Sequence, residues 1–247
     1  MKLKLICCEI FYREACYVAS RSKNRVDVEF LPKGMHDLES GDMRLKLQAA
    51  IDRNSDSDYD YLLLGYALCN NGTAGLTAAS KTLVIPKAHD CITLFLGSRK
   101  KYSDYFSNNP GVYFYTSGWI ERGDDTGDLQ ELSIQHKTGM DKSYEELVRE
   151  YGEDNAKYLY ETLCQGTKNY SKLTFIEMGV GPDDKFEKAA VVRATKNNWK
   201  FEKVKGDISL FTRLLDGPWV ENEFLLVPPG YKIAPSYGDD VLKSVKR

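Results

Sequence analysis

The sequence predicts an α/β protein with a mostly parallel sheet and helices on both of its faces. The first half of the chain alternates short apolar runs with segments whose apolar residues recur at helical spacing. This alternation is typical of a helix-covered parallel sheet, and a similar pattern in the second half suggests two related, Rossmann-like lobes. The strands expected in the first half are Leu3–Ile6, Val26–Leu31, Tyr61–Leu64 and Thr82–Ile85.

The segments between these strands contain the expected helices of the first half. Phe11–Ser20 follows the first strand, and Met43–Ile51 carries apolar residues at helical spacing. Ala74–Ala79 is expected to form a short helix after the glycine-rich loop that follows Leu64. Each of these helices would connect two parallel strands.

The second half continues the pattern. Ser143–Cys164 is expected to be one long helix, because Ser143 can cap it, acidic residues occupy its first turn, and Gly166 follows its end. The polar tail after Lys232 is expected to be loose. The other expected helices are Arg99–Phe106, Leu129–Thr138, Phe186–Thr195 and Ile208–Leu215, and the expected strands are Val112–Tyr115, Leu173–Glu177, Trp199–Val204 and Phe224–Val227.

Length and composition set the class of protein. The 247 residues, 42% of them hydrophobic, predict a single α/β domain over residues 1–247, with lobes 1–118 and 119–247 as a further division. Two domains joined near Gly118–Asp128 are the alternative. A net charge of −2 predicts no nucleic-acid partner. The lack of a signal peptide pattern or a long apolar stretch predicts a cytoplasmic protein that does not enter a membrane.

Parallel strands would bring distant loops together. The segments that leave Ile6, Leu31, Leu64 and Ile85 would share the rim at the carboxyl ends of the strands, where open α/β sheets bind ligands. The residues expected on this rim are Cys8, Glu9, His36, the loop Gly65–Gly75, and the run His89, Asp90 and Cys91.

Six cysteines in a chain expected to be cytoplasmic predict free thiols rather than disulfides. Cys8, Cys69 and Cys91 fall on the rim, and three thiolates suit zinc or an iron–sulfur cluster while leaving one coordination position open. His36 is the expected additional ligand. In the alternative interpretation these cysteines only fill space in the core, as is expected of Cys7 and Cys164, while Cys16 falls within the first expected helix.

Two other kinds of chemistry use the same residues. Cys91 could be a catalytic nucleophile activated by His89 or His36, with Glu9 or Asp90 orienting the imidazole. The loop around Gly65, Asn71 and Gly72 could bind the phosphate of a cofactor, although it matches no established phosphate-binding motif and Asn71-Gly72 also suits a tight turn.

Several segments resemble a prokaryotic family of unknown function, the domain-of-unknown-function family numbered 1638. The segments are ICCE, GMH, GYALCNNGTAGL, LVIPKAHDC with the following LFLGS, and SGWIE. The resemblance covers most of the chain, from Cys8 to Pro229. Ala67 and Lys87 replace a glycine and an arginine of the family pattern, and Lys87 could bind an anion, though without the fork of an arginine. Members are often encoded near corrinoid-dependent methyltransferases. The resemblance therefore implies a role in methyl-group metabolism, with a corrinoid as a further cofactor and a corrinoid protein or methyltransferase as partner.

The sequence thus favours a protein with a three-cysteine metal or iron–sulfur site, acting in or accessory to corrinoid-linked methyl transfer. A non-catalytic protein that binds a small-molecule ligand on the same rim, or an enzyme with a cysteine nucleophile, remains an alternative. If one metal is shared, the sulfurs of Cys8, Cys69 and Cys91 must lie within roughly 8 Å of each other.

Overall fold

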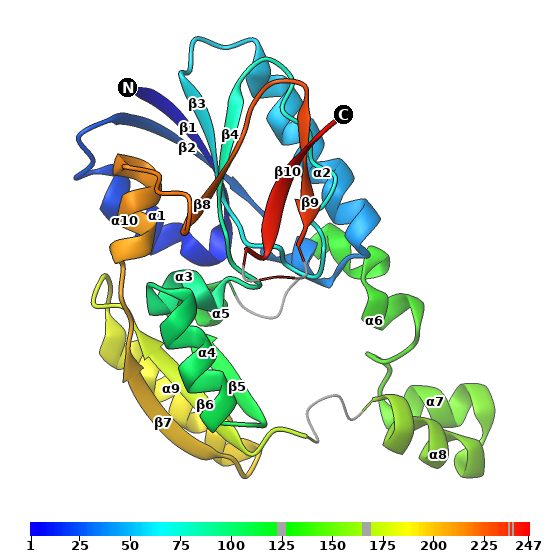
Figure 1. The fold of residues 1–247 in the computed structure, drawn as a ribbon. Coiled ribbons are helices and arrows are strands. Elements are labelled where there is room, and N and C mark those ends of the chain that lie inside the picture. Colours follow the sequence, from blue (N-terminus) through cyan, green and yellow to red (C-terminus); the bar gives the residue numbers. More distant parts are fainter. Residues whose placement is uncertain (123–126, 165–168, 237, 239) are drawn as a thin grey trace.

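A computed structural model describes residues 1–122, 127–164, 169–236, 238 and 240–247. Its largest sheet has the strand order β2-β1-β3-β4-β8 (Figure 1). The strands β1 to β4 run parallel, and β8 pairs antiparallel with β4 at the edge. The α/β prediction, with a mostly parallel sheet, is confirmed. The bounds are β1 Lys2–Cys8, β2 Arg25–Leu31, β3 Tyr61–Gly65, β4 Thr82–Pro86 and β8 Phe224–Val227.

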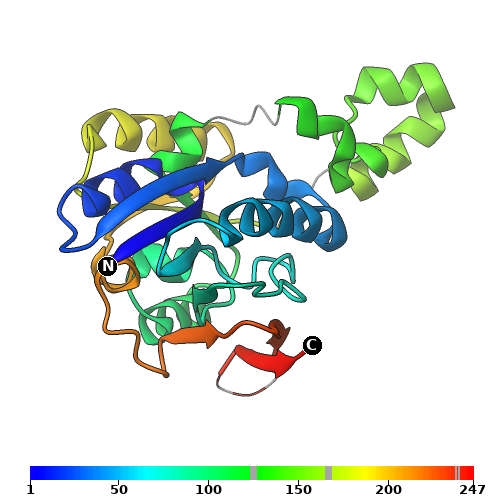
Figure 2. The same cartoon turned by 90° about the horizontal axis from the view of Figure 1, so that it is seen from above.

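Strands β3 and β4, in the interior of this sheet, are apolar because helices cover both of its faces. Helices α1 (Tyr12–Ala19) and α10 (Ser209–Asp216) pack together on one face, and α2 (Ser40–Ser55) covers the other (Figures 1 and 2). In β3, Leu62, Leu63 and Leu64 are fully buried. The core therefore lies on both sides of the sheet, directly below the rim.

A second, three-stranded parallel sheet has the order β5-β6-β7, with bounds Val112–Thr116, Lys172–Glu177 and Lys200–Lys205. Helix α9 (Asp183–Lys196) packs on one face of it, while α4 (Arg99–Asn108) reaches the other through Tyr105, whose hydroxyl lies 2.6 Å from Thr174 Oγ1. The two sheets do not correspond to residues before and after 118. Strand β5, which precedes residue 118, pairs with β6, which follows it, and the chain later returns to the first sheet as β8. The single-domain arrangement stays a prediction.

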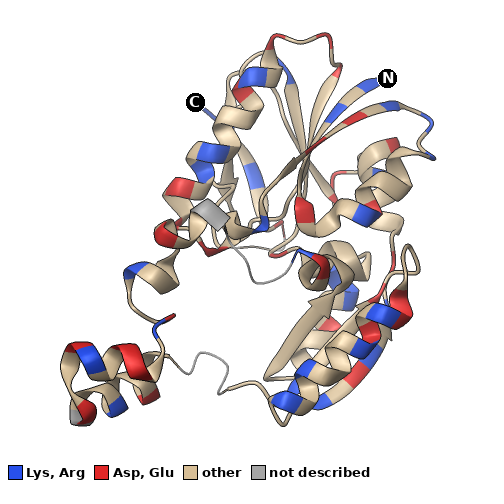
Figure 3. Ribbon diagram, turned by 180° about the vertical axis from the view of Figure 1, so that it is seen from behind, with Lys and Arg blue, Asp and Glu red and all other residues tan. Residues whose placement is uncertain are grey.

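The prediction of one helix over Ser143–Cys164 is wrong. The chain forms α7 (Tyr144–Tyr151) and α8 (Glu153–Leu163), which meet at Gly152, whose φ of 77° lies outside the helical region. The predicted cap is confirmed, since Ser143 and Glu146 form a reciprocal capping box. Gly166 lies outside the described residues. Figure 3 shows acidic and basic residues along both helices of this hairpin, which projects away from the two sheets.

The predicted loose tail is also wrong. Strands β9 (Tyr231–Pro235) and β10 (Leu242–Lys246) form an antiparallel hairpin, which buries Ile233 and Leu242. The polar residues of this segment mark the solvent face of a hairpin rather than a disordered end.

The predicted helix Ala74–Ala79 is replaced by turns. Cys69, Asn70 and Asn71 all have positive φ angles, and Gly72 N–H and Ala74 N–H donate to carbonyls within the loop. Thr77 then forms an isolated bridge to Lys232 of β9. The remaining short helices are η1 Glu9–Phe11, η2 Lys33–Asp37, α3 Ile92–Leu96, α5 Ser117–Glu121, η3 Gly127–Leu132 and α6 Ile134–Lys137.

Candidate functional site

The loops that leave β1, β2, β3 and β4 meet at one edge of the large sheet. Cys8 ends β1, and the β3 and β4 loops run side by side because Leu68 N–H donates to the Ala88 carbonyl and Cys69 N–H to the His89 carbonyl. Those two bonds measure 2.9 and 3.1 Å. They hold Cys69 next to the turn that carries Cys91. The predicted convergence of these three cysteines is therefore found.

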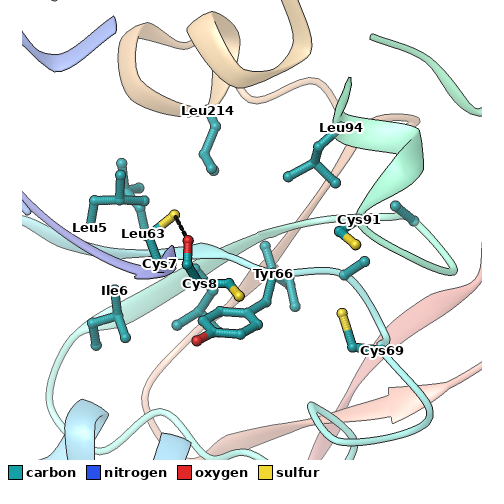
Figure 4. Close-up of a cluster of buried hydrophobic side chains, with 14 of the residues drawn as sticks. Leu5, Ile6, Cys7, Cys8, Leu63, Tyr66, Cys69, Cys91, Leu94 and Leu214 are labelled. Atoms are coloured by element: carbon teal, nitrogen blue, oxygen red, sulfur yellow. Dashed lines mark hydrogen bonds between the residues drawn. The ribbon is translucent and has the colours of Figure 1, made fainter. Parts of the chain in front are cut away.

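The three cysteines line one small cavity of about 20 Å³ (Figure 4). In Figure 4 Cys69 and Cys91 lie on the right of the view, and Cys8 lies to their left, beside Tyr66. The rest of the wall is mainly apolar, with Lys33, His36 and Tyr66 as its other polar residues. The remaining lining residues are Ile10, Phe11, Met35, Met43, Gly65 and Trp119.

Burial controls the chemistry of these thiols. It raises the pKa of Cys8 and of Cys69 to about 12, and it raises the pKa of Cys91 well above its usual value. Cys69 and Cys8 raise the pKa of Cys91 further, because a thiolate on any of them would repel the next. Without a cation between them, all three are neutral thiols at neutral pH.

No group of three or more His, Cys, Asp or Glu side chains is arranged as a metal site among the residues that the structure describes. The donor set is nevertheless suitable for a soft ion, because three sulfurs converge on one cavity. A metal ion would require the thiols to turn toward one another about their Cα–Cβ bonds.

Tyr66 is the unpaired polar group of this cavity. Its side chain is 3% exposed, and its hydroxyl has no hydrogen-bond partner within the described part of the chain. Burial, followed by the neighbouring Cys8, raises the pKa of the phenol well above its usual value. In Figure 4 the ring lies beside Cys8, and its hydroxyl end points away from Cys69 and Cys91.

The two histidines of the predicted site lie apart. His36 is exposed at the side of the cysteine cavity, where its ring meets Trp119 edge-on at a centroid distance of 6.5 Å. His89 is exposed and lines a separate, open depression of about 590 Å³ beside Arg99 and Tyr102. His89 therefore does not face the cavity that the cysteines share.

The predicted orienting carboxylates have other partners. Glu9 accepts a hydrogen bond from the backbone N–H of Lys33 at 2.7 Å and lies 3.9 Å from Arg122. Asp90 accepts one from Ile92 N–H and one from the hydroxyl of Tyr102, at 3.0 and 2.6 Å. Both carboxylates brace the rim loops.

The predicted cofactor-binding residues show packing roles. A Cβ atom on Gly65 would lie 2.4 Å from Cys7 Sγ, and one on Gly72 would lie 2.2 Å from Met43 Sδ. Asn71 is exposed at a positive φ of 62° in the turn. Lys87 is buried and paired with Asp240 Oδ1 at 2.8 Å. Phosphate or anion binding by these residues stays a prediction.

Sequence reasoning missed Tyr66 and Lys33. Both directly follow residues that were expected on the rim or in its turns, since Tyr66 comes after Gly65 and Lys33 after Pro32. A polar side chain just beyond the end of a buried strand was the signal available. Of the other cysteines, Cys7 is buried as expected, whereas Cys16 is exposed and Cys164 is half-buried.

A family model described as "Protein of unknown function (DUF1638)" matches residues 30–215. The chain belongs to the DUF1638 family. The resemblance found in the sequence is thereby confirmed, and the matched span of this DUF1638 protein includes Cys69 and Cys91. Neither the curated proteins nor the solved structures give a match. None of the described helices is long and apolar enough to cross a membrane.

Proposed function

We propose that this DUF1638 protein binds one soft metal ion, with zinc the first choice, through Cys8, Cys69 and Cys91. The supporting observation is that three thiols, one at the end of β1 and two in the loops after β3 and β4, line a single cavity. Three thiolates leave one position of a tetrahedral ion open, and there the ion would act as a Lewis acid.

The charges around the cavity suit such an ion. Three thiolates carry one more negative charge than a divalent cation neutralises, and a buried excess charge is costly. Lys33, only 7% exposed in the wall of the cavity, carries a positive charge that favours the thiolate form of Cys8. Glu9 adds no net charge, because it is paired with Arg122.

The volume of the cysteine cavity favours a single ion over an iron–sulfur cluster. A cavity of about 20 Å³ has room for about one water-sized group. A cluster contains several irons and sulfides and would have to displace buried side chains such as Phe11 and Met43.

The nucleophile interpretation has less support. A reactive cysteine needs a depressed pKa and a nearby base, but burial raises the pKa of Cys91 and the exposed His89 lines a different depression. A protein that binds a small molecule without a metal also has less support at this cavity, because about 20 Å³ has room for only one water-sized group.

The family resemblance extends the proposal to corrinoid-linked methyl transfer. In that role the open position of the ion would accept a small molecule on the rim. A corrinoid protein or a methyltransferase would be the partner.

Metal uptake by cysteine variants tests the proposal. The reduced protein, kept anaerobic, should take up one Zn²⁺ per chain, and Cys69→Ser should weaken zinc binding by at least about 100-fold, because a thiolate ligand is lost. Cys8→Ser and Cys91→Ser should do the same. Cys16→Ser, on the exposed face of α1, is the control and should bind as the unchanged protein does. Equal affinity in Cys69→Ser and Cys16→Ser would reject the proposal.

A further inference from the structure

The open depression beside His89 shares no lining residue with the cysteine cavity within the described part of the chain. Its volume of about 590 Å³ lies within the roughly 300–1,000 Å³ of small-molecule sites. Part of its wall is the segment just before β8, with Asn222 and Glu223. Another part is one face of α4, because the lining residues of this helix recur three or four positions apart. These α4 residues are Arg99, Lys100, Tyr102, Ser103, Phe106 and Ser107.

A pair of stacked aromatic rings lies on this face of α4. The rings of Tyr102 and Phe106 have centroids 5.7 Å apart and planes inclined by 22°. Phe106 is 51% exposed although its side chain is wholly apolar, and it lines the depression. The hydroxyl of Tyr102 donates to Asp90 at 2.6 Å, which holds the Tyr102 ring in place. The pair therefore offers a flat surface on which a planar ring can stack.

Positive side chains lie one and two turns away from these rings on the same wall. Arg99 donates to a neutral backbone carbonyl at 2.8 Å, a bond that removes none of its charge. Lys100 lies 3.2 Å from Asp104 in an exposed pair, and such pairs contribute little. Glu223 is held by two nitrogens of Arg213, each at 2.7 Å, so its negative charge is already compensated. This end of the depression suits an anionic group.

The separation between the cations and the rings sets the length of a ligand that uses both. Arg99 and Phe106 are seven positions apart on α4, which corresponds to about 10 Å along a helix. A phosphate ion is too short to reach both, and an uncharged ring compound would leave the cations unused. Ser103 lies between them on the helix, and its exposed hydroxyl can donate or accept a hydrogen bond.

We propose that this depression binds a nucleoside monophosphate, with the base stacked on Phe106 and the phosphate beside Arg99 and Lys100. The sugar hydroxyls would meet Ser103. Because every base has a flat face, the aromatic surface is expected to accept purines and pyrimidines alike. The site is separate from the glycine-rich loop after β3, and it needs no metal ion at the cysteines.

Calorimetric titration with adenosine monophosphate, in the presence of a chelator, tests the proposal without a contribution from metal. The unchanged protein should bind this nucleotide with a dissociation constant below about 1 mM at low salt. Adenosine and inorganic phosphate should each bind at least about 10-fold more weakly, because each lacks one of the two contacts. Added salt should weaken the binding of the nucleotide more than that of adenosine, since it screens the phosphate contact.

Variants of two exposed residues locate the site. Phe106→Leu should weaken nucleotide binding by about 10-fold, because stacking is lost while an apolar side chain remains. Lys100→Gln should weaken binding of the nucleotide and leave that of adenosine unchanged, since adenosine carries no phosphate. The matched controls are Tyr158→Leu in α8 and Lys46→Gln in α2, both exposed and outside the depression. Both controls should bind as the unchanged protein does.

Four results would overturn the proposal. The site is rejected if the unchanged protein shows no binding of the nucleotide up to about 10 mM, or if Phe106→Leu and Tyr158→Leu bind it equally. Equal binding of inorganic phosphate and the nucleotide would reject the ring contact. Equal binding of benzoate would reject the nucleotide in favour of a small aromatic acid. None of these results bears on the cysteines, so the metal site stands or falls separately.

Discussion

Glu14 shows how far burial can shift the pKa of a single carboxyl group. It lies in α1, is 1% exposed, and neither of its carboxyl oxygens has a hydrogen-bond partner among the described residues. Burial raises its pKa to about 7, and the nearby acids Asp183 and Glu121 add to the shift while Arg13 opposes it. The carboxyl group is therefore half protonated near neutral pH, where an ordinary glutamate is ionised.

Glu14 should make the protein less stable as the pH rises. Its pKa is higher in the folded chain than the ordinary value of 4.5, so its cost is absent below about pH 4.5 and complete above about pH 7. The full cost is about 3 kcal/mol of unfolding free energy. Urea unfolding at pH 4 and pH 8 should show a loss of this size in the unchanged protein relative to Glu14→Gln. The same pH dependence in both proteins would contradict the burial argument.

Among the elements of the site, the pairing of β1 with β3 leaves little room for a side chain at one position, Gly65. Cys7 lies opposite Gly65 in the parallel register, and its sulfur occupies the space that a side chain on Gly65 would need. A glycine is thus required at this position because the two strands approach each other closely. This steric requirement explains the glycine more directly than phosphate binding does.

Gly65→Ala should destabilise the fold by about 1–3 kcal/mol, because the new methyl group has to displace the buried Cys7 sulfur. Gly41→Ala is the control in α2, where nothing lies within 4 Å of the added atom. It should stabilise the protein by up to about 1 kcal/mol through helix propensity. Chemical unfolding of both variants measures the contrast, and a neutral Gly65→Ala would disprove the steric role.

At the scale of the whole molecule, the strands β1 to β8 could be predicted from the sequence, but the pairing of β8 could not. The parallel strands up to β4 follow from apolar runs and helical spacing, and these gave the shared rim of Cys8, Cys69 and Cys91. Phe224–Val227 was recognised as a strand, but its antiparallel place beside β4 depends on pairing with a residue about 140 positions earlier, which local patterns do not encode.

The directions in which side chains point could not be predicted from the sequence either. His89 and Cys91 are two residues apart, yet His89 is exposed beside α4 while Cys91 is buried in the cavity. The geometry of the turn after Pro86 decides which of these two side chains is buried. The residue types alone do not decide it. Tyr66 was missed because an unsatisfied hydroxyl is a property of the packed structure.

The central claim is that Cys8, Cys69 and Cys91 together bind one ion, and X-ray absorption at the zinc edge tests it most directly. The zinc-loaded protein should show three sulfur neighbours at about 2.3 Å and one lighter neighbour at the open position. Cys69→Ser, if it retains zinc at high concentration, should show two sulfurs. A shell of oxygen and nitrogen alone, or a sulfur count that Cys69→Ser leaves unchanged, would contradict the proposed site.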